Sequence, residues 1–251
     1  LETDIFGSGH GTVEGRANFL AEPNPAVKAA VELAKVPIAY FAPMAARTNV
    51  RIEGGTLTAS GNVEYGRKVQ AVRLKKLAIH GVKLDYIHTS ETARAESRRA
   101  QKVKKAAKEV SNKPDLILTI EHFSLTESNV GFINSYGGKK VRLFLSDTNL
   151  YLDNFSNQFS KGPATARLSG KFMGSGATEA KATFRPEDKG PDLDLYLKID
   201  NTQLASLNDL LRSYGHFDVT AGTFSLVTEL HVKNNRVNGY IKPFFKDMKV
   251  Y

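Results

Sequence analysis

The sequence predicts a mainly β protein whose strands form an antiparallel sheet and are organised as repeated units. Two observations predict this class. Apolar and polar residues alternate through most of the 251 residues, and such alternation is typical of strands with one covered face and one solvated face. A series of these strands also recurs in the same order in both halves of the chain, which is typical of repeat proteins.

The clearest strand is residues 192–200, DLDLYLKID. Its leucines and isoleucine alternate with Asp, Tyr and Lys, so the two sets point to opposite faces. In chain order, similar alternation predicts strands at residues 11–20, 26–34, 49–63, 67–88, 115–123, 139–153, 164–172, 177–184, 216–232 and 236–250.

Three segments break the alternation. Residues 36–46 are apolar with two prolines and predict a short broken helix. Residues 202–214 space their leucines at helical intervals. Residues 90–110 are rich in Ala, Lys, Arg and Glu without Gly or Pro, and therefore predict the longest helix.

The predicted helix at 90–110 carries recognisable end signals. Thr89 or Ser90 is the expected N-cap, Glu91 lies in the first turn, and Pro114 follows the end. The apolar positions of the helix form one narrow stripe, namely Ala93, Ala100, Val103, Ala107 and Val110.

Positive charge is concentrated around this helix. The chain has a net charge of +9, and residues 67–108 alone hold 13 basic and 3 acidic residues, so the remainder is near neutral. One interpretation is a surface that contacts phosphates of anionic lipid or nucleic acid, with Arg94, Arg98 and Lys102 as contacts. The other is a solvated connecting helix. No nucleic-acid-binding motif accompanies the segment, so we expect no nucleic-acid partner.

The internal repeat divides the chain. Residues 7–19 align with 173–184, which pairs Gly9 with Gly174 and Gly11 with Gly176, and a strand, a short helix, a Gly-Thr strand and a tail follow in both copies, about 165 to 167 residues apart. This predicts a C-terminal part of one β repeat unit, a helical connector and a second β repeat unit, at residues 1–88, 89–112 and 113–251. We expect the chain to be a piece of a longer repeat protein.

Motifs for catalysis and metal binding are missing from the sequence. The absence of Cys excludes disulfides, thiolate metal sites and a cysteine nucleophile. The six histidines are not spaced as metal ligands, and the glycines of GSGHGTVEG lack a dinucleotide-binding spacing. Asp188, Asp192 and Asp194 form only a weak calcium candidate, because alternation places the last two on a solvated strand face. We expect no enzymatic activity, catalytic residue, metal or cofactor. No apolar run reaches the roughly 20 residues of a membrane-spanning helix.

Several segments resemble the AsmA-like proteins of Gram-negative envelopes, especially their large subfamily with long β repeats. These segments are RLSGKFMGSGATEAKATF, LASLNDLLRSYGHFDVTAGTFSL and a V-x-G-x-I-x-P strand at 237–243. The resemblance covers most of residues 115–251 and, more loosely, 1–88. It implies a long curved antiparallel sheet folded into a taco-like β-groove with an apolar inner face. It also implies a periplasmic protein, anchored in the inner membrane, that carries phospholipid towards the outer membrane and meets components of both membranes and other envelope proteins.

The leading hypothesis is therefore a segment that shields phospholipid acyl chains in an apolar groove. The expected lining residues are Val31, Leu33, Leu57, Phe184, Leu195, Leu197, Ile199, Phe224 and Leu226. Two alternatives stay open. The apolar face is the filled core of a closed sandwich or barrel, or the chain is a β-rich scaffold without lipid cargo that binds anionic partners through its basic helix.

Overall fold

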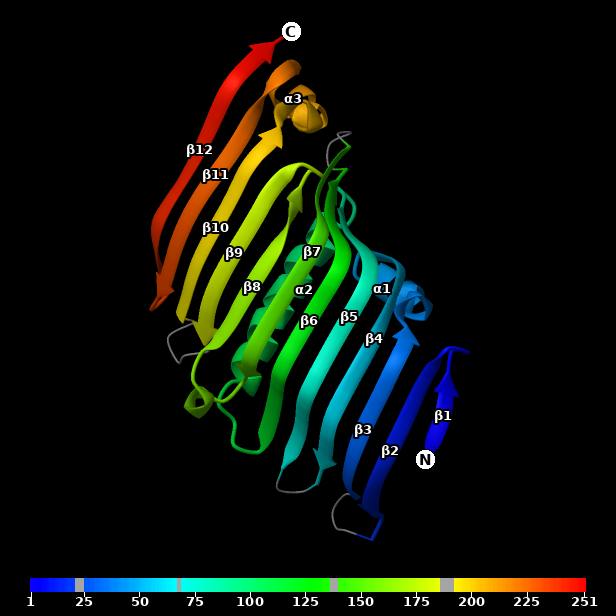
Figure 1. Ribbon diagram of the computed structural model, residues 1–251. Coiled ribbons are helices and arrows are strands. Elements are labelled where there is room, and N and C mark those ends of the chain that lie inside the picture. Colours follow the sequence, from blue (N-terminus) through cyan, green and yellow to red (C-terminus); the bar gives the residue numbers. More distant parts are fainter. Residues whose placement is uncertain (21–24, 67–68, 136–139, 186–191) are drawn as a thin grey trace.

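The computed structural model describes residues 1–20, 25–66, 69–135, 140–185 and 192–251. They form one twelve-stranded sheet whose strands follow chain order (Figure 1). The mainly β, mostly antiparallel class is confirmed. The strands are β1 (Glu2–Ile5), β2 (Gly9–Asn18), β3 (Ala26–Pro37), β4 (Val50–Tyr65), β5 (Gln70–His88), β6 (Leu116–Asn134), β7 (Val141–Ser156), β8 (Ala164–Phe172), β9 (Gly176–Arg185), β10 (Asp192–Gln203), β11 (Val219–Lys233) and β12 (Arg236–Val250).

Short helical segments interrupt the strand order at three places. The 3-10 turn η1 (Ile38–Phe41) and helix α1 (Ala42–Ala46) follow β3, and η4 (Leu204–Leu207) and α3 (Asn208–Gly215) follow β10. A third turn, η3 (Phe159–Lys161), precedes β8. The two helical pairs correspond to the segments predicted at 36–46 and 202–214.

The long helix α2 (Ala93–Val110) connects β5 to β6. These two strands are the only parallel neighbours in the described sheet. A parallel pair needs a long crossover, because the chain must return to the same end before the next strand starts. The predicted connector helix supplies that crossover.

The start of α2 differs from the sequence prediction. The cap residue is Thr92 and makes no capping hydrogen bond through its side chain, and the acidic residue of the first turn is Glu96, not Glu91. Thr89 does not cap the helix but accepts a hydrogen bond from the Thr92 N–H at 3.1 Å. The Thr92 hydroxyl donates instead to the Glu96 carboxylate at 2.5 Å. Thr89 thus fixes the backbone just before the helix through its hydrogen bond with Thr92 and does not act as a simple N-cap.

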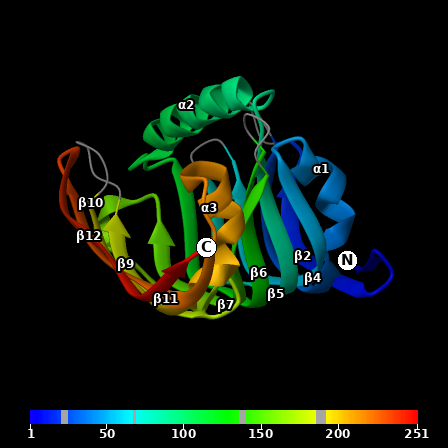
Figure 2. The same ribbon diagram turned by 90° about the horizontal axis from the view of Figure 1, so that it is seen from above.

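The sheet is curved and open. Seen from above, the strands form a trough whose concave side faces α2 (Figure 2). The strands at the two edges, β1 and β12, are not paired with each other. The accessible surface is 16,002 Å², whereas a compact monomer of 27.6 kDa exposes about 11,000 Å². A closed sandwich or barrel, one of the sequence-based alternatives, is therefore wrong.

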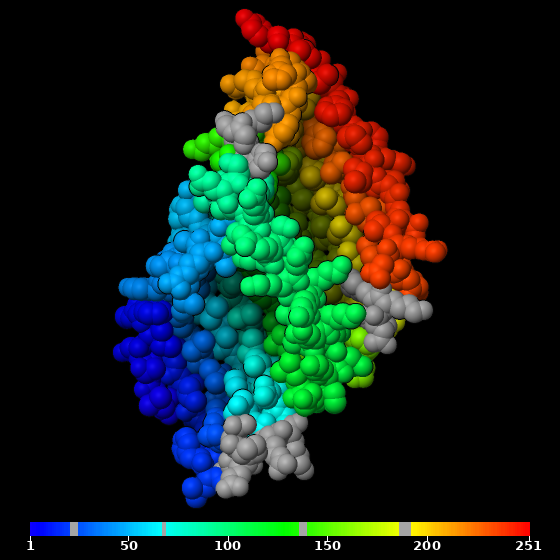
Figure 3. All heavy atoms as spheres, turned by 180° about the vertical axis from the view of Figure 1, so that it is seen from behind, coloured from blue at the N-terminus to red at the C-terminus, as the bar shows by residue number. Residues whose placement is uncertain are grey.

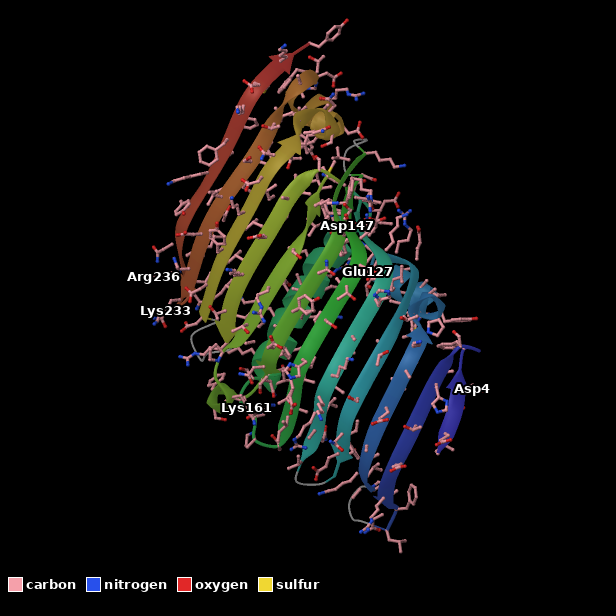
Figure 4. The ribbon with its side chains drawn as sticks, viewed as in Figure 1. Asp4, Glu127, Asp147, Lys161, Lys233 and Arg236 are labelled. Carbon is pink, nitrogen blue, oxygen red and sulfur yellow. The ribbon has the colours of Figure 1, made fainter. Side chains whose placement is uncertain are left out.

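Many strands contain a left-handed residue where the pairing register shifts. Lys35, Glu127, Asp147 and Asn201 have φ between 50° and 54°. At each of them the pairing register with a neighbouring strand shifts. Between β5 and β6 the register is kept, because both strands shift at the same point. Glu127 and Asp147 project from β6 and β7 on the convex face (Figure 4). Such irregularities bend strands and increase their twist. Their recurrence across the sheet accounts for the trough.

The left-handed residues match between the two halves of the chain. Six pairs have positive φ at a separation of 166 or 167 residues, namely Phe6 and Met173, Gly7 and Gly174, Lys35 and Asn201, Asn49 and His216, Gly55 and Gly222, and Gly81 and Asp247. The predicted pairing of Gly9 with Gly174 is therefore wrong by two residues. The equivalent segments are the two GSG turns, 7–9 and 174–176, and the separation is nearly constant.

A hydrogen bond also recurs at the same separation. The backbone N–H of Lys35 donates to the Thr58 hydroxyl at 3.3 Å, and the N–H of Asn201 donates to the Ser225 hydroxyl at 3.0 Å. At both places a left-handed residue loses its regular ladder partner, and a hydroxyl on the next strand replaces it. This exchange satisfies a donor that a regular strand would have paired.

One buried apolar cluster lies at the α3 end of the trough. Leu204, Leu207 and Val219 form a buried cluster where η4 meets β11. The Asn208 side chain fixes this end, because its amide donates to the Val219 carbonyl and its oxygen accepts from the Val219 N–H, both at 2.9 Å. Partly buried neighbours complete the cluster, namely Leu143, Phe172, Met173, Leu211, Phe217 and Phe224.

Candidate functional site

The concave face of the trough carries apolar residues in rows that run from strand to strand. The strand register places the members of each row directly opposite one another. The first row is Gly11, Leu33, Ala59, Leu77, Phe123, Leu152, Ala166, Ala182, Leu195, Leu230 and Gly239. The second row is Val36, Leu57, Ile79, Leu125, Leu150, Leu168, Ala180, Leu197, Thr228 and Ile241.

A third row runs towards the other end of the strands. Phe155 and Phe184 are in tilted ring contact, with centroids 6.4 Å apart, and join its two parts across β8. Its members are Val13, Val31, Gly61, Leu74, Ile120, Phe155, Ala164, Phe184, Leu193, Val232 and Val237. Neighbouring strands lie about 4.8 Å apart, so rows that reach from β2 to β12 extend roughly 50 Å along the sheet.

The left-handed residues keep this face apolar along each strand. In β5 the apolar positions are Leu77 and Ile79 before Gly81, but Val82 and Leu84 after it. A strict period of two would turn Val82 to the convex face. Because Gly81 has a φ of 68°, the alternation changes phase there, and Val82 stays on the concave side, where it is buried beside Ile38 and Gly55.

Most residues of the three rows are neither buried nor fully exposed to solvent. In β10, Leu193, Leu195 and Leu197 are each intermediate in exposure, whereas Ile199, nearer the core cluster, is buried. Side chains in a filled core are almost fully enclosed. These side chains contact their neighbours within the sheet but have no second apolar layer on top of them.

Helix α2 lies across the mouth of the trough and is attached at its ends. At its start, the Glu96 carboxylate contacts His88 Nδ1 at 2.6 Å and accepts a hydrogen bond from the Asn49 amide at 2.8 Å. At its end, the Asn157 amide donates to the Val110 carbonyl at 2.7 Å. His88 and Asn49 belong to β5 and the turn before β4, and Asn157 follows β7, so the helix spans several strands.

Between these attachments α2 does not pack on the sheet. No residue of the helix is buried, and Val103 in the middle of its apolar stripe is 66% exposed. The space-filling view shows the helix crossing the hollowed concave side, with recessed surface on both sides of it (Figure 3). The apolar stripe of α2 thus faces the trough without covering the rows.

The Glu96 carboxylate is held in its charged form. Burial alone would raise its pKa, but hydrogen bonds from Thr92 and His88, together with the charge of His88 and the hydrogen bond from Asn49, lower the pKa of Glu96 below its ordinary 4.5. Ionised Glu96 is therefore the stable partner for three groups at the start of the helix.

The basic residues of α2 point in different directions. Because Glu96 contacts the sheet, the side of the helix that bears it faces the trough. At 3.6 residues per turn, Arg94 and Arg98 lie on the side of the helix opposite to Glu96, and Lys102 lies closer to that outward side than to the trough. All three side chains are exposed. Arg99 lies one turn after Glu96 on the trough side and is half-buried. Sequence reasoning selected the first three residues and missed Arg99.

All nine lining residues predicted from the sequence lie on the concave face. Leu33 and Leu195 belong to the first row, Leu57 and Leu197 to the second, and Val31 and Phe184 to the third, as the pairings require. Ile199 pairs with Leu226 next to the rows. Phe224 packs against the core cluster and touches Phe245, with ring centroids 5.5 Å apart. These last three residues lie closer to the α3 end than the rest.

The convex face is polar and its charges are paired between strands. Asp85 is almost fully enclosed, and its carboxylate bridges Arg51 and Arg142, each at 2.8 Å. Hydrogen bonds from these two arginines keep the pKa of Asp85 below 3.8 although burial raises it. A Cβ at Gly131 would collide with this carboxylate, so glycine is required on the neighbouring strand.

Further polar contacts cross the convex face at most strand junctions. They include the ion pairs of Lys28 with Glu64 and Lys171 with Asp147, and the contacts of His122 with Asp153 and His231 with Asp194. Asp194 is thereby engaged by His231 at 2.6 Å, and Asp188 lies outside the described residues. In the part of the chain that the structure describes, no three His, Cys, Asp or Glu side chains gather into a metal-binding group.

Comparison with protein-family models finds no match, and comparison with curated proteins finds none either. Among the described helices, none combines the length and the apolarity needed to cross a membrane.

Proposed function

We propose that the chain binds phospholipid acyl chains along its concave face and shields them from water. The observation that carries the proposal is the set of three rows of mostly apolar residues that are only half-covered by the protein. Exposed apolar patches of this extent are uncommon on soluble proteins and mark surfaces for other molecules.

The chemistry of an acyl chain suits this surface. A flexible hydrocarbon chain needs a continuous apolar track and no specific hydrogen-bonding group. Full transfer of one methylene from water contributes about 0.8 kcal/mol. A chain that loses half of its water contact over a dozen methylenes therefore gains several kcal/mol, which is enough for capture and still permits movement along the rows.

We further propose that the fragment belongs to a longer envelope protein of the AsmA-like type. In this proposal residues 1–88 are the C-terminal part of one repeat unit, residues 89–112 are the connector, and residues 113–251 are a second unit. The matched left-handed residues and the matched hydrogen bonds of Lys35 and Asn201 support repetition. Periplasmic location, an inner-membrane anchor outside this fragment, and transport towards the outer membrane are parts of the proposal that the resemblance supplies. The proposal assigns no catalytic residue and no cofactor.

Lipid extraction followed by mass spectrometry tests acyl-chain binding. The purified chain is expected to retain phospholipid, and Leu197→Asp should lower the retained amount severalfold, because a carboxylate would interrupt the second row. Tyr196→Asp is the matched control, since Tyr196 neighbours Leu197 but faces the convex side. Equal retention by wild type and a folded Leu197→Asp variant would contradict the proposal, and so would an equal loss in both variants.

A second candidate function is supported by the outward side of α2. Arg94, Arg98 and Lys102 are exposed and face away from the trough, as expected of a scaffold that binds anionic surfaces. Sedimentation with phosphatidylglycerol vesicles should then fall steeply with added salt and vanish when the three residues are changed to Gln. Salt-independent binding would contradict this function, and tighter binding to DNA than to vesicles would redirect it to nucleic acid.

A further inference from the structure

Arg99 is the basic residue of α2 that is turned into the trough. The other basic residues of the helix are exposed, whereas Arg99 is half-buried. Glu96, one turn earlier on the same side, is fixed to His88 and Asn49, so contacts set the orientation of the helix, and helix periodicity then places Arg99 on its trough side.

The guanidinium of Arg99 is incompletely paired. Within the described part of the chain, its Nη2 atom is enclosed and has no hydrogen-bond partner. The neighbouring carboxylate of Glu96 is already engaged by Thr92, His88 and Asn49. An enclosed cationic nitrogen without a partner costs free energy. Because the residue as a whole is only half-buried, a change of rotamer that brings its guanidinium to an anion in the trough would remove that cost.

The surroundings of Arg99 differ from the rest of the concave face. Near the start of α2 the face carries Tyr86, His88 and Phe132, whose rings stack at centroid distances of 6.1 and 6.3 Å. On the next position Asn134 donates to the Tyr214 hydroxyl at 2.7 Å. Polar and aromatic groups therefore gather at this end, while the apolar rows continue away from it. This polarity matches that of a phospholipid.

We propose that Arg99 binds the phosphate of a phospholipid whose acyl chains lie on the apolar rows, so that the trough selects phosphate-bearing lipids over neutral ones. The inference rests on the proposed function and adds the class of head group. The planar fork of a guanidinium can donate two hydrogen bonds to one phosphate, which favours arginine over lysine for this task.

The test is a competition between two lipids with the same acyl chains. The whole chain is incubated with vesicles that contain equal amounts of dioleoyl phosphatidylglycerol and dioleoylglycerol, and the lipids that it extracts are quantified by mass spectrometry. Wild type should enrich phosphatidylglycerol. Arg99→Gln should reduce that enrichment about tenfold, the loss expected for one charge-assisted hydrogen bond, while total captured lipid stays similar. Arg99→Lys should keep part of the enrichment.

Lys105→Gln is the matched control, because it removes the same charge from the outward side of the same helix and lies outside the set Arg94, Arg98 and Lys102. An unchanged lipid ratio in Arg99→Gln, or an equal drop in Lys105→Gln, would overturn the role of Arg99. Capture of both lipids without preference by wild type would overturn this inference alone. Capture of neither lipid would overturn the proposed function and the inference together.

Discussion

The two faces of the same twelve strands differ in how far their side chains find partners within the protein. On the convex face, charges are paired across strand junctions. The enclosed carboxylate of Asp85, for example, is balanced by the guanidinium groups of Arg51 and Arg142. On the concave face, apolar rows such as that of Leu150 and Leu168 lack a covering layer. The charged groups of the convex face find partners within the sheet, whereas the apolar rows of the concave face are only partly covered by the protein. Single substitutions on the two faces are therefore expected to change the free energy of unfolding by different amounts.

The largest effect is expected on the convex face. Asp85→Ala leaves Arg51 and Arg142 without their shared carboxylate, and breaking a buried ion pair typically costs 3–5 kcal/mol. Both arginines are partly exposed, with 47% and 29% accessible side chains, so water compensates some of the loss. We expect about 3 kcal/mol, measured by chemical denaturation. Asp194→Ala, which removes an exposed partner of His231 on the same face, should change little. A loss as small as that of the control would mean that the enclosed carboxylate does not stabilise the sheet.

The second effect separates the core from the rows. Leu204 is 1% exposed in the core cluster, and Leu204→Ala should cost about 2–4 kcal/mol because it opens a cavity. Leu150→Ala removes the same atoms from the half-exposed second row, and should cost about 1 kcal/mol because less surface is returned to water. Bound lipid should increase the cost at Leu150 and leave that at Leu204 unchanged. Equal costs in lipid-free protein would indicate that the rows are packed as a core.

The smallest effect concerns the attachment of α2. The hydrogen bonds of Glu96 favour its ionised form, so their contribution is present above its unfolded pKa of about 4.5 and is lost as the pH falls through the lower pKa of the folded state. Glu96→Gln should cost about 1 kcal/mol at neutral pH. The difference in denaturation midpoint between wild type and variant should shrink as the pH falls below 4.5. A difference that is independent of pH would show that the charge of Glu96 is not what attaches the helix.

Much of the fold follows from alternation in the sequence. The strand at 192–200 was predictable because its leucines occupy every second position, and β10 covers it. The orientation of all nine lining residues followed from the same periodicity. The predictions from sequence were wrong where two similar local signals stand close together. Thr89 resembles a helix cap but hydrogen-bonds to Thr92 instead, and the glycine pairing of the repeat slipped by two residues because GSGHG contains two similar glycine spacings.

The left-handed residues were visible in the sequence only indirectly. Gly81 could have been found because the apolar positions change phase after it, from Ile79 to Val82. Lys35 and Glu127 carry no such signal in their residue type, since lysine and glutamate rarely adopt positive φ. Their conformation depends on side chains of the adjacent strand, such as Thr58, which accepts the N–H that Lys35 cannot pair within the ladder.

The sequence by itself determined which residues alternate, where the helices interrupt the strands, and where the positive charge is concentrated, because these properties are local. Only the tertiary structure decided that the sheet stays open, that α2 crosses it without packing, and that Arg99 and not Arg94 faces the trough. These features depend on pairings between distant segments, such as Asn49 with Glu96 and Asn157 with Val110. Periodicity defines an apolar face, but whether that face closes on itself depends on the curvature accumulated over the whole sheet.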